Sequence, residues 1–137
     1  MILPQFYTDD IIKRAILEDI NYVDVASDYL ISEEQRNEAY FVSKADGVLC
    51  GIDVAMRVFE LLDDSFTAKV YMHDGDKVKK GDLIAEFSGK TTLLLKGERT
   101  ALNLLQHMSG IATATAKAVK LCEGTNASIA DTRKTLP

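Results

Sequence analysis

The sequence predicts an α+β protein, because helical and strand-like patterns both occur and alternate along the chain. The chain has 137 residues, which by length alone suggests one domain. Apolar residues make up 47% of it, enough to build a sizeable core. Apolar stripes near both ends indicate helices, and the stretch between them runs or alternates apolar in short pieces separated by turn residues.

The first half should hold two helices with two strands between them. Thr8 or Asp9 can cap the first helix, in which isoleucines recur four residues apart. The segment after it has little periodicity and is expected to be a loop with short structure. The expected elements are a helix over residues 8–19, a loop over 21–32, strands over 38–43 and 47–51 around a turn, and a helix over 52–62.

The second half should hold a β-rich stretch, a long helix and one last strand. Turn residues at 74–76, 79–82 and 88–90 divide the β-rich stretch. The helix is expected over residues 97–122, with Gly110 marking a kink or break. Gly124 is expected in the left-handed position that ends the helix, and residues 127–130 are expected to be a strand.

This order divides the chain into two unequal parts. Residues 1–108 form a plausible α+β unit on their own. Residues 109–137 continue the long helix and add one strand, which is how an α/β domain begins.

Charge and cysteine content narrow the function classes. The formal net charge is −5, which argues against a general nucleic-acid binder but leaves room for a local cationic site. Cys50 and Cys122 could pair, but they are expected to be reduced core thiols. The first residues lack a basic-then-apolar leader, and no apolar run approaches about 20 residues. The cytoplasm is therefore the expected location.

The last residues, "DTRKT", are the first candidate site. They follow the last expected strand, and ligands of α/β folds bind at the carboxyl ends of strands. Arg133 offers a planar fork for a carboxylate or phosphate, and Lys134 offers a compact charge. Thr132 and Thr135 add hydroxyl groups. The same residues also fit a solvated basic tail.

The segment "KGERTALN" is the second candidate site, at the expected start of the long helix. Glu98 suits a first helical turn, whereas Arg99 opposes the helix dipole there. An anion shared with the helix amides would explain Arg99, and so would a side chain that simply extends from the surface.

Other chemistry finds less support in the sequence. His73 is expected in a surface turn and His107 in helix packing, and neither has a partner at metal-ligand spacing. The segment "VKKGD" lies in a hairpin of the kind that biotinyl or lipoyl carrier domains use. Lys79 or Lys80 would then be the modified lysine, although the residues that usually flank that lysine are missing.

Five phrases together resemble the quinolinate phosphoribosyltransferase family. The resemblance extends over nearly the whole chain, and its two most specific pieces are "ERTALNLLQHMSGIAT" and "DTRKT". The five are "ILEDINYVDV" from Ile16, "ADGVLCGIDVAMRVF" from Ala45, "DGDKVKKGDLIAEFSG" from Asp74, "LLLKGERTALNLLQHMSGIATAT" from Leu93 and "ADTRKTLP" from Ala130.

The resemblance implies a fold and a reaction. The fold is an open-faced α/β sandwich domain joined by a long helix to an incomplete α/β barrel, of which this chain would hold only the first strand. The reaction joins quinolinate to phosphoribosyl pyrophosphate with Mg2+, and yields nicotinate mononucleotide, CO2 and pyrophosphate for NAD biosynthesis. The enzymes are homodimers in which the sandwich domain of one subunit covers the barrel mouth of the other.

The resemblance also implies roles for four residues. Arg133 matches the arginine that grips a quinolinate carboxylate. Thr132 and Lys134 match neighbours that help to hold the substrate and phosphoribosyl groups. Arg99 matches the arginine that reaches into the active site of the neighbouring subunit. These substrates are multiply charged. Side chains of opposite charge can position them, which suits a displacement reaction in which the protein does little covalent chemistry itself.

Two departures from the family pattern stand out. After Asp19 the family usually reads close to G-D-x-T-T, whereas this chain reads "VDVAS" from Val23, so Asp24 is kept and the paired threonines are not. The family's barrel also continues for about as many residues again, with a His-Arg pair, a Lys, a Glu and an Asp and with the Mg2+ ligands. The 137 residues alone are therefore expected to be inactive.

Overall fold

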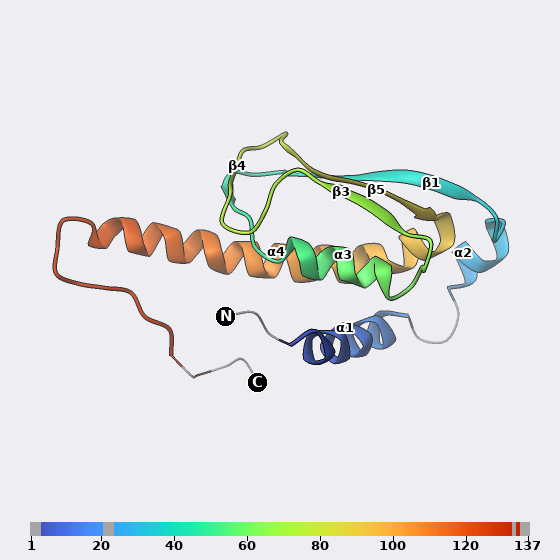
Figure 1. Ribbon diagram of the computed structural model, residues 1–137, viewed down its shortest axis with the longest axis horizontal. Coiled ribbons are helices and arrows are strands. Elements are labelled where there is room, and N and C mark those ends of the chain that lie inside the picture. The colour runs from blue at the N-terminus through green and yellow to red at the C-terminus, as the bar shows by residue number, and fades with distance from the viewer. Residues whose placement is uncertain (1–3, 21–23, 133, 135–137) are drawn as a thin grey trace.

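A three-stranded antiparallel sheet packs on two helices in the computed structural model (Figure 1). The structure describes residues 4–20, 24–132 and 134. Its elements are α1 (Gln5–Asp19), α2 (Val25–Leu30), β1 (Arg36–Val42), β2 (Gly47–Val48), α3 (Ile52–Glu60), β3 (Thr67–Val70), β4 (Lys77–Val78), β5 (Leu83–Lys90) and α4 (Thr91–Cys122). The α+β class predicted from the sequence is confirmed.

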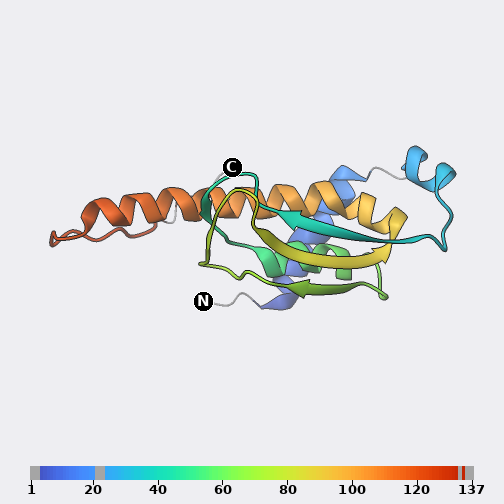
Figure 2. The same cartoon turned by 90° about the horizontal axis from the view of Figure 1, so that it is seen from above.

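The strands form two separate antiparallel sheets. The larger sheet has the order β1-β5-β3, and the smaller one pairs β2 with β4. The two strands expected around the turn at residues 44–46 therefore do not pair with each other, because β1 pairs with β5 and β2 with β4. In Figure 2 the long helix α4 runs along the β1 side of the larger sheet.

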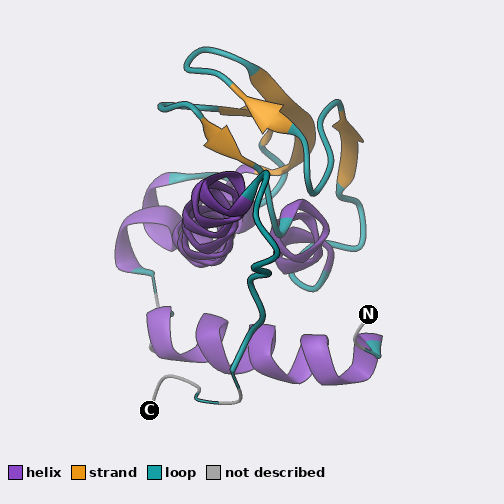
Figure 3. Cartoon of the chain, turned by 90° about the vertical axis from the view of Figure 1, so that its left-hand side faces the viewer, coloured by secondary structure: helices purple, strands orange, loops and turns teal. Residues whose placement is uncertain are grey.

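The core lies between the inner face of the larger sheet and the helices α3 and α4 (Figure 3). Four phenylalanines pack there. The rings of Phe41 and Phe87, on neighbouring strands, are 4.9 Å apart, and Phe59 of α3 stacks 5.0 Å from Phe87 and 5.4 Å from Phe66. Burial of such large apolar rings dominates the stabilisation of a small core.

Helix α1 begins at Gln5, earlier than the expected Thr8. Pro4 takes the N-cap position and no side chain caps the helix, so the expected capping by Thr8 or Asp9 was wrong. Asp9 lies inside the helix and instead accepts two hydrogen bonds from Arg57 of α3, at 2.9 and 2.8 Å. This guanidinium holds the pKa of Asp9 below its ordinary value. The pair ties α1 to the sandwich.

A short helix occupies the segment that was expected to be a loop with short structure. The carboxylate of Asp24 accepts a hydrogen bond from the amide of Ser27 over 3.4 Å and so caps α2. This capping explains why an aspartate stands at that position. Residues 21–23 of the same segment lie outside the described residues.

Helix α3 follows the expected apolar stripe and buries Val58 and Phe59. A residue distant in sequence caps it, because the Oδ1 atom of Asp74 accepts from the amides of Gly51 and Ile52 at 2.8 and 3.0 Å. Gly51 has a φ of +94°, which favours glycine. The loop before β4 is thereby fastened to the start of α3.

Helix α4 begins at Thr91 rather than at the expected residue 97. It also runs without a break through Gly110, so the expected break there was wrong; one glycine inside a long helix costs only about 1 kcal/mol against alanine. His107 was expected in packing but is exposed. The predicted domain boundary after residue 108 falls inside this continuous helix, and the division into domains stays a prediction.

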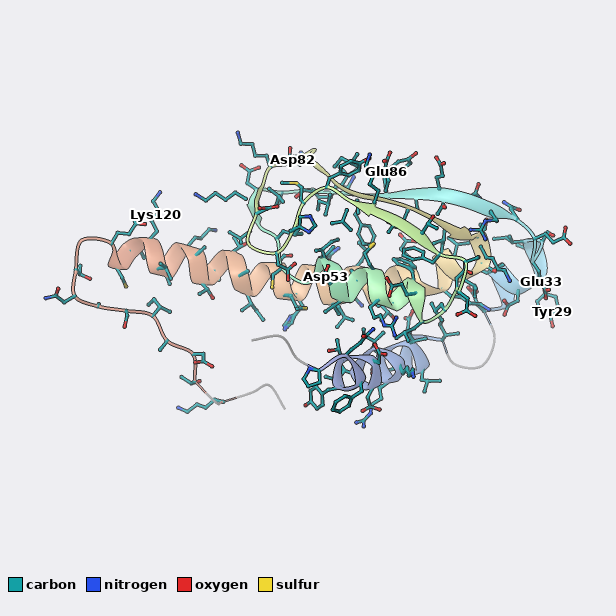
Figure 4. All side chains as sticks on the ribbon, viewed as in Figure 1. Tyr29, Glu33, Asp53, Asp82, Glu86 and Lys120 are labelled. Atoms are coloured by element: carbon teal, nitrogen blue, oxygen red, sulfur yellow. The ribbon has the colours of Figure 1, made fainter. Side chains whose placement is uncertain are left out.

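The end of α4 extends beyond the sandwich, and Lys120 lies on this projecting part (Figure 4). Its apolar side chains are uncovered there, with Ile111 55% and Leu121 84% exposed. Gly124 follows the helix with a φ of +79°, as expected for its end. The expected strand over residues 127–130 does not form, because no described strand pairs with these residues.

The two cysteines are free and partly buried. Cys50 lies just after β2, and Cys122 is the last residue of α4. Burial raises the pKa of the Cys50 thiol, and the nearby Asp74 carboxylate raises it further. The thiol is thus kept protonated, which agrees with a packing role rather than a nucleophilic one.

Candidate functional site

Arg99 projects from α4 into solvent, with 74% of its side chain exposed. Its Nη1 atom lies 2.9 Å from Oδ1 of Asp19, the last residue of α1. An exposed ion pair of this kind contributes about 0–1 kcal/mol, so it orients the guanidinium without locking it. The remaining N–H groups of Arg99 have no acceptor among the described residues.

Lys96 lies one helical turn before Arg99 on the same flank of α4. Its Nζ atom contacts Oδ1 of Asp28, in α2, over 2.5 Å, and only 19% of the side chain is exposed. The flank therefore carries two cations held by carboxylates from two other helices. Lys96 is the more buried and the more firmly placed of the two.

The expectation that these cations stand at a helix start was wrong. Helix α4 begins at Thr91, so Lys96 and Arg99 lie in its second and third turns. The terminal amides of α4 are therefore not available to an anion that Arg99 binds. What remains for Arg99 is a surface guanidinium that pairs with Asp19 of α1 and whose other N–H groups have no acceptor among the described residues.

The second candidate site lies in the chain segment after α4. Thr132 and Lys134 are exposed, and the Lys134 amide donates to the Thr132 hydroxyl over 3.4 Å. Arg133, predicted as a carboxylate ligand, lies outside the described residues, as does Thr135. Among the described residues, no hydrogen bond or ion pair joins this segment to Arg99.

Sequence reasoning missed the two carboxylates that hold the flank. Asp19 is 80 residues from Arg99 and Asp28 is 68 residues from Lys96. Asp19 lies in one of the phrases that carried the family resemblance, but nothing in the local spacing pairs it with α4. Only the packing of α1 and α2 against α4 brings these charges together.

The outer face of the larger sheet carries a polar cluster that is paired within itself. Tyr40 donates to Glu38 over 3.2 Å, which raises the pKa of Tyr40. Tyr71 donates to Glu86, which points outward from β5 in Figure 4, and Lys69 lies 4.8 Å from the centre of the Tyr71 ring. The tyrosines and carboxylates of this cluster are thus paired with one another on the surface of the sheet.

The described part of the chain shows neither a cluster of three or more metal-ligating side chains nor a membrane-spanning helix. Within residues 4–20, 24–132 and 134, no group of three or more His, Cys, Asp or Glu side chains could hold a metal ion. The Mg2+ expected from the family resemblance stays a prediction. No helix in the described part of the chain is long and apolar enough to cross a bilayer.

Comparison with protein families identifies the sandwich. The family model described as quinolinate phosphoribosyl transferase, N-terminal domain, matches residues 24–109. A probable nicotinate-nucleotide pyrophosphorylase (carboxylating) of Bacillus subtilis is 40% identical over 127 residues, which are 93% of this chain and 44% of that protein. A mitochondrial quinolinate phosphoribosyltransferase (decarboxylating) of Nicotiana tabacum is 36% identical over 98% of this chain and 38% of its own length.

Solved structures agree with the sequence comparison. NadC from Streptococcus pyogenes matches all of this chain and 49% of its own, with a TM-score of 0.94 and 37% identity. The nicotinate-nucleotide pyrophosphorylase of Francisella tularensis matches with a TM-score of 0.91 and 32% identity, over 99% of this chain and 49% of its own. The chain thus spans about half the length of these relatives. Since the family model covers more than half of the residues, the chain belongs to the quinolinate phosphoribosyltransferase family and matches its N-terminal domain.

Proposed function

We propose that the chain forms the N-terminal part of an enzyme that joins quinolinate to phosphoribosyl pyrophosphate. The products are nicotinate mononucleotide, CO2 and pyrophosphate, a step of NAD biosynthesis. The observation that carries this proposal is the family match over residues 24–109, supported by the agreement of the whole fold with NadC.

In this proposal the chain contributes positive charge rather than acid–base groups. Quinolinate is a dianion and phosphoribosyl pyrophosphate carries more charge, so fixed guanidinium and ammonium groups can position both. The exposed guanidinium of Arg99 suits this task. The paired carboxylate of Asp9 has a structural role instead, because its two hydrogen bonds from Arg57 join α1 to α3.

Arg99 would act on the neighbouring subunit of a homodimer. Two observations support this: the side chain is 74% exposed, and its one described partner is the carboxylate of Asp19. An arginine with a largely exposed side chain can reach a ligand held by another chain. Thr132, Arg133 and Lys134 would bind the substrates of their own subunit.

Mg2+ would bind pyrophosphate oxygens and neutralise their charge during the reaction. Its protein ligands would come from the second half of the enzyme. The cytoplasm remains the proposed location, and fractionation of the producing cells tests it. The relative from Nicotiana tabacum is named as mitochondrial, which is a statement about that protein alone.

A chimera tests the proposal. It joins residues 1–137 to the part of the Bacillus subtilis relative that lies outside the match, and is called the chimera below. It should form nicotinate mononucleotide from quinolinate, whereas the 137 residues alone should form none. If the folded chimera is inactive with quinolinate but active with nicotinate or another acceptor, that acceptor replaces quinolinate as the proposed substrate. Turnover by the 137 residues alone would contradict the need for the second half.

The carrier alternative has its own test. Lys79 and Lys80 lie in the turn between β4 and β5, which is where a carrier domain would place its modified lysine. The intact mass of the protein, purified from cells that biotinylate and lipoylate their own carriers, should equal the unmodified mass. An adduct on Lys79 or Lys80 would favour the carrier function instead.

A further inference from the structure

Helix α4, rather than a strand, covers one edge of β2 and of the two residues that follow it. On the opposite edge Leu49 bonds toward β4: its amide donates to the Asp76 carbonyl over 2.9 Å, and its carbonyl accepts from the Gly75 amide over 2.8 Å. Successive residues of a strand direct their N–H and C=O groups to opposite edges. Val48 and Cys50 therefore direct theirs away from β4 and toward α4.

Two hydroxyl groups of α4 take the place of a neighbouring strand there. Oγ1 of Thr113 accepts from the Val48 amide at 2.9 Å and donates to the Val48 carbonyl at 3.5 Å. Oγ of Ser109 accepts from the Cys50 amide at 3.0 Å and donates to the Cys50 carbonyl at 3.1 Å. Four residues of a helix advance about 6.0 Å and two residues of a strand about 6.6 Å, so the two spacings agree. These four bonds are called the hydroxyl clamp below.

Two glycines allow the helix to approach the backbone at the ends of the hydroxyl clamp. A Cβ on Gly47 would lie 2.7 Å from Oγ1 of Thr113, and a Cβ on Gly51 would lie 2.7 Å from Sδ of Met108. Both distances are too short for a carbon atom in van der Waals contact. Moving α4 by one residue along its axis would shift the hydroxyls by about 1.5 Å and bring other side chains onto the glycines. The hydroxyl clamp therefore fixes the helix in one register.

The hydroxyl clamp is also the last polar attachment of α4 to the sandwich. Leu105 is the last buried residue of the helix, which continues to Cys122, and beyond Thr113 the described residues of α4 make no side-chain hydrogen bond to the sandwich. Gly110 lies between the two hydroxyl-bearing residues, and a glycine weakens a helix. The hydroxyl clamp thus braces the helix on both sides of this glycine. It determines the direction of the projecting end, on which Lys120 lies (Figure 4).

We propose that Ser109 and Thr113 are positioning residues for the phosphoribosyl transfer. They fix α4, and α4 joins the two candidate binding segments. Arg99 lies about 15 Å before Ser109 along the helix, and the segment that contains Thr132 and Lys134 follows the end of the helix.

The placement of α4 affects both sites of the proposed homodimer. Each site would combine Arg99 of one subunit with Thr132 and Lys134 of the other. A displaced α4 would misplace these groups, and a misplacement of about 1 Å can lower a rate by about 100-fold. This consequence rests on the proposed function, whereas the placement of α4 by the hydroxyl clamp does not.

One double variant removes the hydroxyl clamp. Ser109→Ala together with Thr113→Val deletes both hydroxyls and nearly keeps the side-chain volumes. Thr115→Val makes the second of these changes on the exposed side of the same helix. Ile84→Val removes one methylene from a buried residue of β5, so it lowers stability without removing a hydrogen bond of α4. These two variants are the controls.

Distances between spin labels test the placement of α4 in the 137-residue chain. The labels are attached to Asp53→Cys at the start of α3 and to Lys120→Cys on the projecting end, after both native cysteines are replaced by alanine. Pulsed electron paramagnetic resonance should give one narrow distance distribution for this parent and for the controls. The double variant should broaden the distribution by at least about 3 Å, because the helix then bends at Gly110. An unchanged distribution in the double variant would overturn the proposal.

Steady-state kinetics of the chimera test the consequence for the reaction. The double variant should lower kcat/KM at least about tenfold, whereas the controls should keep it within about twofold. A residue that only stabilises the fold would not separate the double variant from Ile84→Val. Thr113→Ser keeps the hydroxyl and should retain more activity than Thr113→Val, which keeps the shape. Equal activity of these two, or parent-like kcat/KM in the double variant, would contradict the proposal.

The two experiments separate this proposal from the proposed function. If the parent chimera forms no nicotinate mononucleotide, the proposed function fails, and the spin-label distances still decide whether the hydroxyl clamp places α4. If the double variant does not fold, Thr113→Val alone replaces it in both experiments, with Thr113→Ser as its matched partner. Distances that are the same in these two single variants would then overturn the proposal.

Discussion

Arg99 and Asp19 meet on the surface of the sandwich, with Nη1 of the arginine 2.9 Å from Oδ1 of the aspartate. Asp19 is 22% exposed and Arg99 is 74% exposed, so the arginine keeps most of its donors toward solvent. A substrate anion can therefore bind Arg99 without first displacing a buried ion pair. In this arrangement Asp19 orients the guanidinium of Arg99, and the binding of an anion does not require their ion pair to break.

The first prediction follows from that weak coupling. In the chimera, Asp19→Asn should change KM for quinolinate or phosphoribosyl pyrophosphate by less than about fivefold, because an exposed pair contributes about 0–1 kcal/mol. Arg99→Ala should lower kcat/KM by about 100-fold or more. Steady-state kinetics measure both. Arg14→Ala, which removes another exposed arginine, is the control and should leave both constants unchanged.

The second prediction concerns the hydroxyl groups that fasten α4 to β2. Oγ1 of Thr113 accepts from the Val48 amide at 2.9 Å, and Oγ of Ser109 accepts from the Cys50 amide at 3.0 Å. Thr113→Val keeps the shape and removes the acceptor, so it should cost about 1–2 kcal/mol in urea unfolding. Thr115→Val lies on the exposed side of the same helix. Equal losses for the two variants would show that the Val48 bond contributes nothing.

The third prediction compares two glycines in α4. A Cβ on Gly97 would lie 2.8 Å from Cδ1 of Phe59, a buried ring, whereas a Cβ on Gly110 would meet nothing within 4 Å. Gly97→Ala should therefore destabilise the protein, because overpacking costs about 1–3 kcal/mol and outweighs the better helix propensity. Gly110→Ala should stabilise it by about 0.5–1 kcal/mol. Thermal unfolding of both variants decides; a loss of stability with Gly110→Ala would mean that the helix does not continue there.

The fourth prediction is a pH dependence at Asp63, which is 5% exposed. Burial favours a higher pKa, but hydrogen bonds from Ser65 and from the Lys90 amide outweigh it and hold the pKa of Asp63 below its ordinary value. A depressed pKa gives stability that is present above the unfolded value near 4 and is lost as the pH falls through the folded value. Asp63→Asn should thus cost about 1–3 kcal/mol at neutral pH, and less below about pH 4.

The check is urea unfolding of both proteins at several pH values between neutral and strongly acidic. Asp64→Asn, at the exposed neighbouring position, should match the parent at every pH. A deficit of Asp63→Asn that stays constant down to acidic pH would show that the charge of Asp63 is not what stabilises the loop.

The spacing of apolar residues predicted correctly those helices whose position depends mainly on their own residues. The α3 stripe is an example, since Ala55 and Val58 are buried as the periodicity indicates. The start of α4 was missed because Thr91 to Leu95 are β-branched or apolar and follow a strand without a break. Packing determines that these residues are helical, since Gly97 lets α4 approach the ring of Phe59 closely.

The candidate site was predicted only in part. The family resemblance pointed to Arg99, but its partner Asp19 is 80 residues away and only the packing of α1 reveals it. The strand expected at residues 127–130 depends on neighbouring strands that the described chain does not supply. A strand is specified by its partners as much as by its own residues, so no local pattern could settle this element.

Mixing two inactive variants of the chimera tests the central claim, that this chain supplies Arg99 to the neighbouring subunit for phosphoribosyl transfer to quinolinate. One variant carries Arg99→Ala and the other Arg133→Ala, and equal amounts are unfolded and refolded together. If Arg99 acts across the dimer, half of the dimers are mixed and each has one intact site, so nicotinate mononucleotide forms at about a quarter of the parent rate. If the mixture stays as inactive as the separate variants, although mass measurement confirms mixed dimers, Arg99 does not act on the neighbouring subunit and the account is wrong.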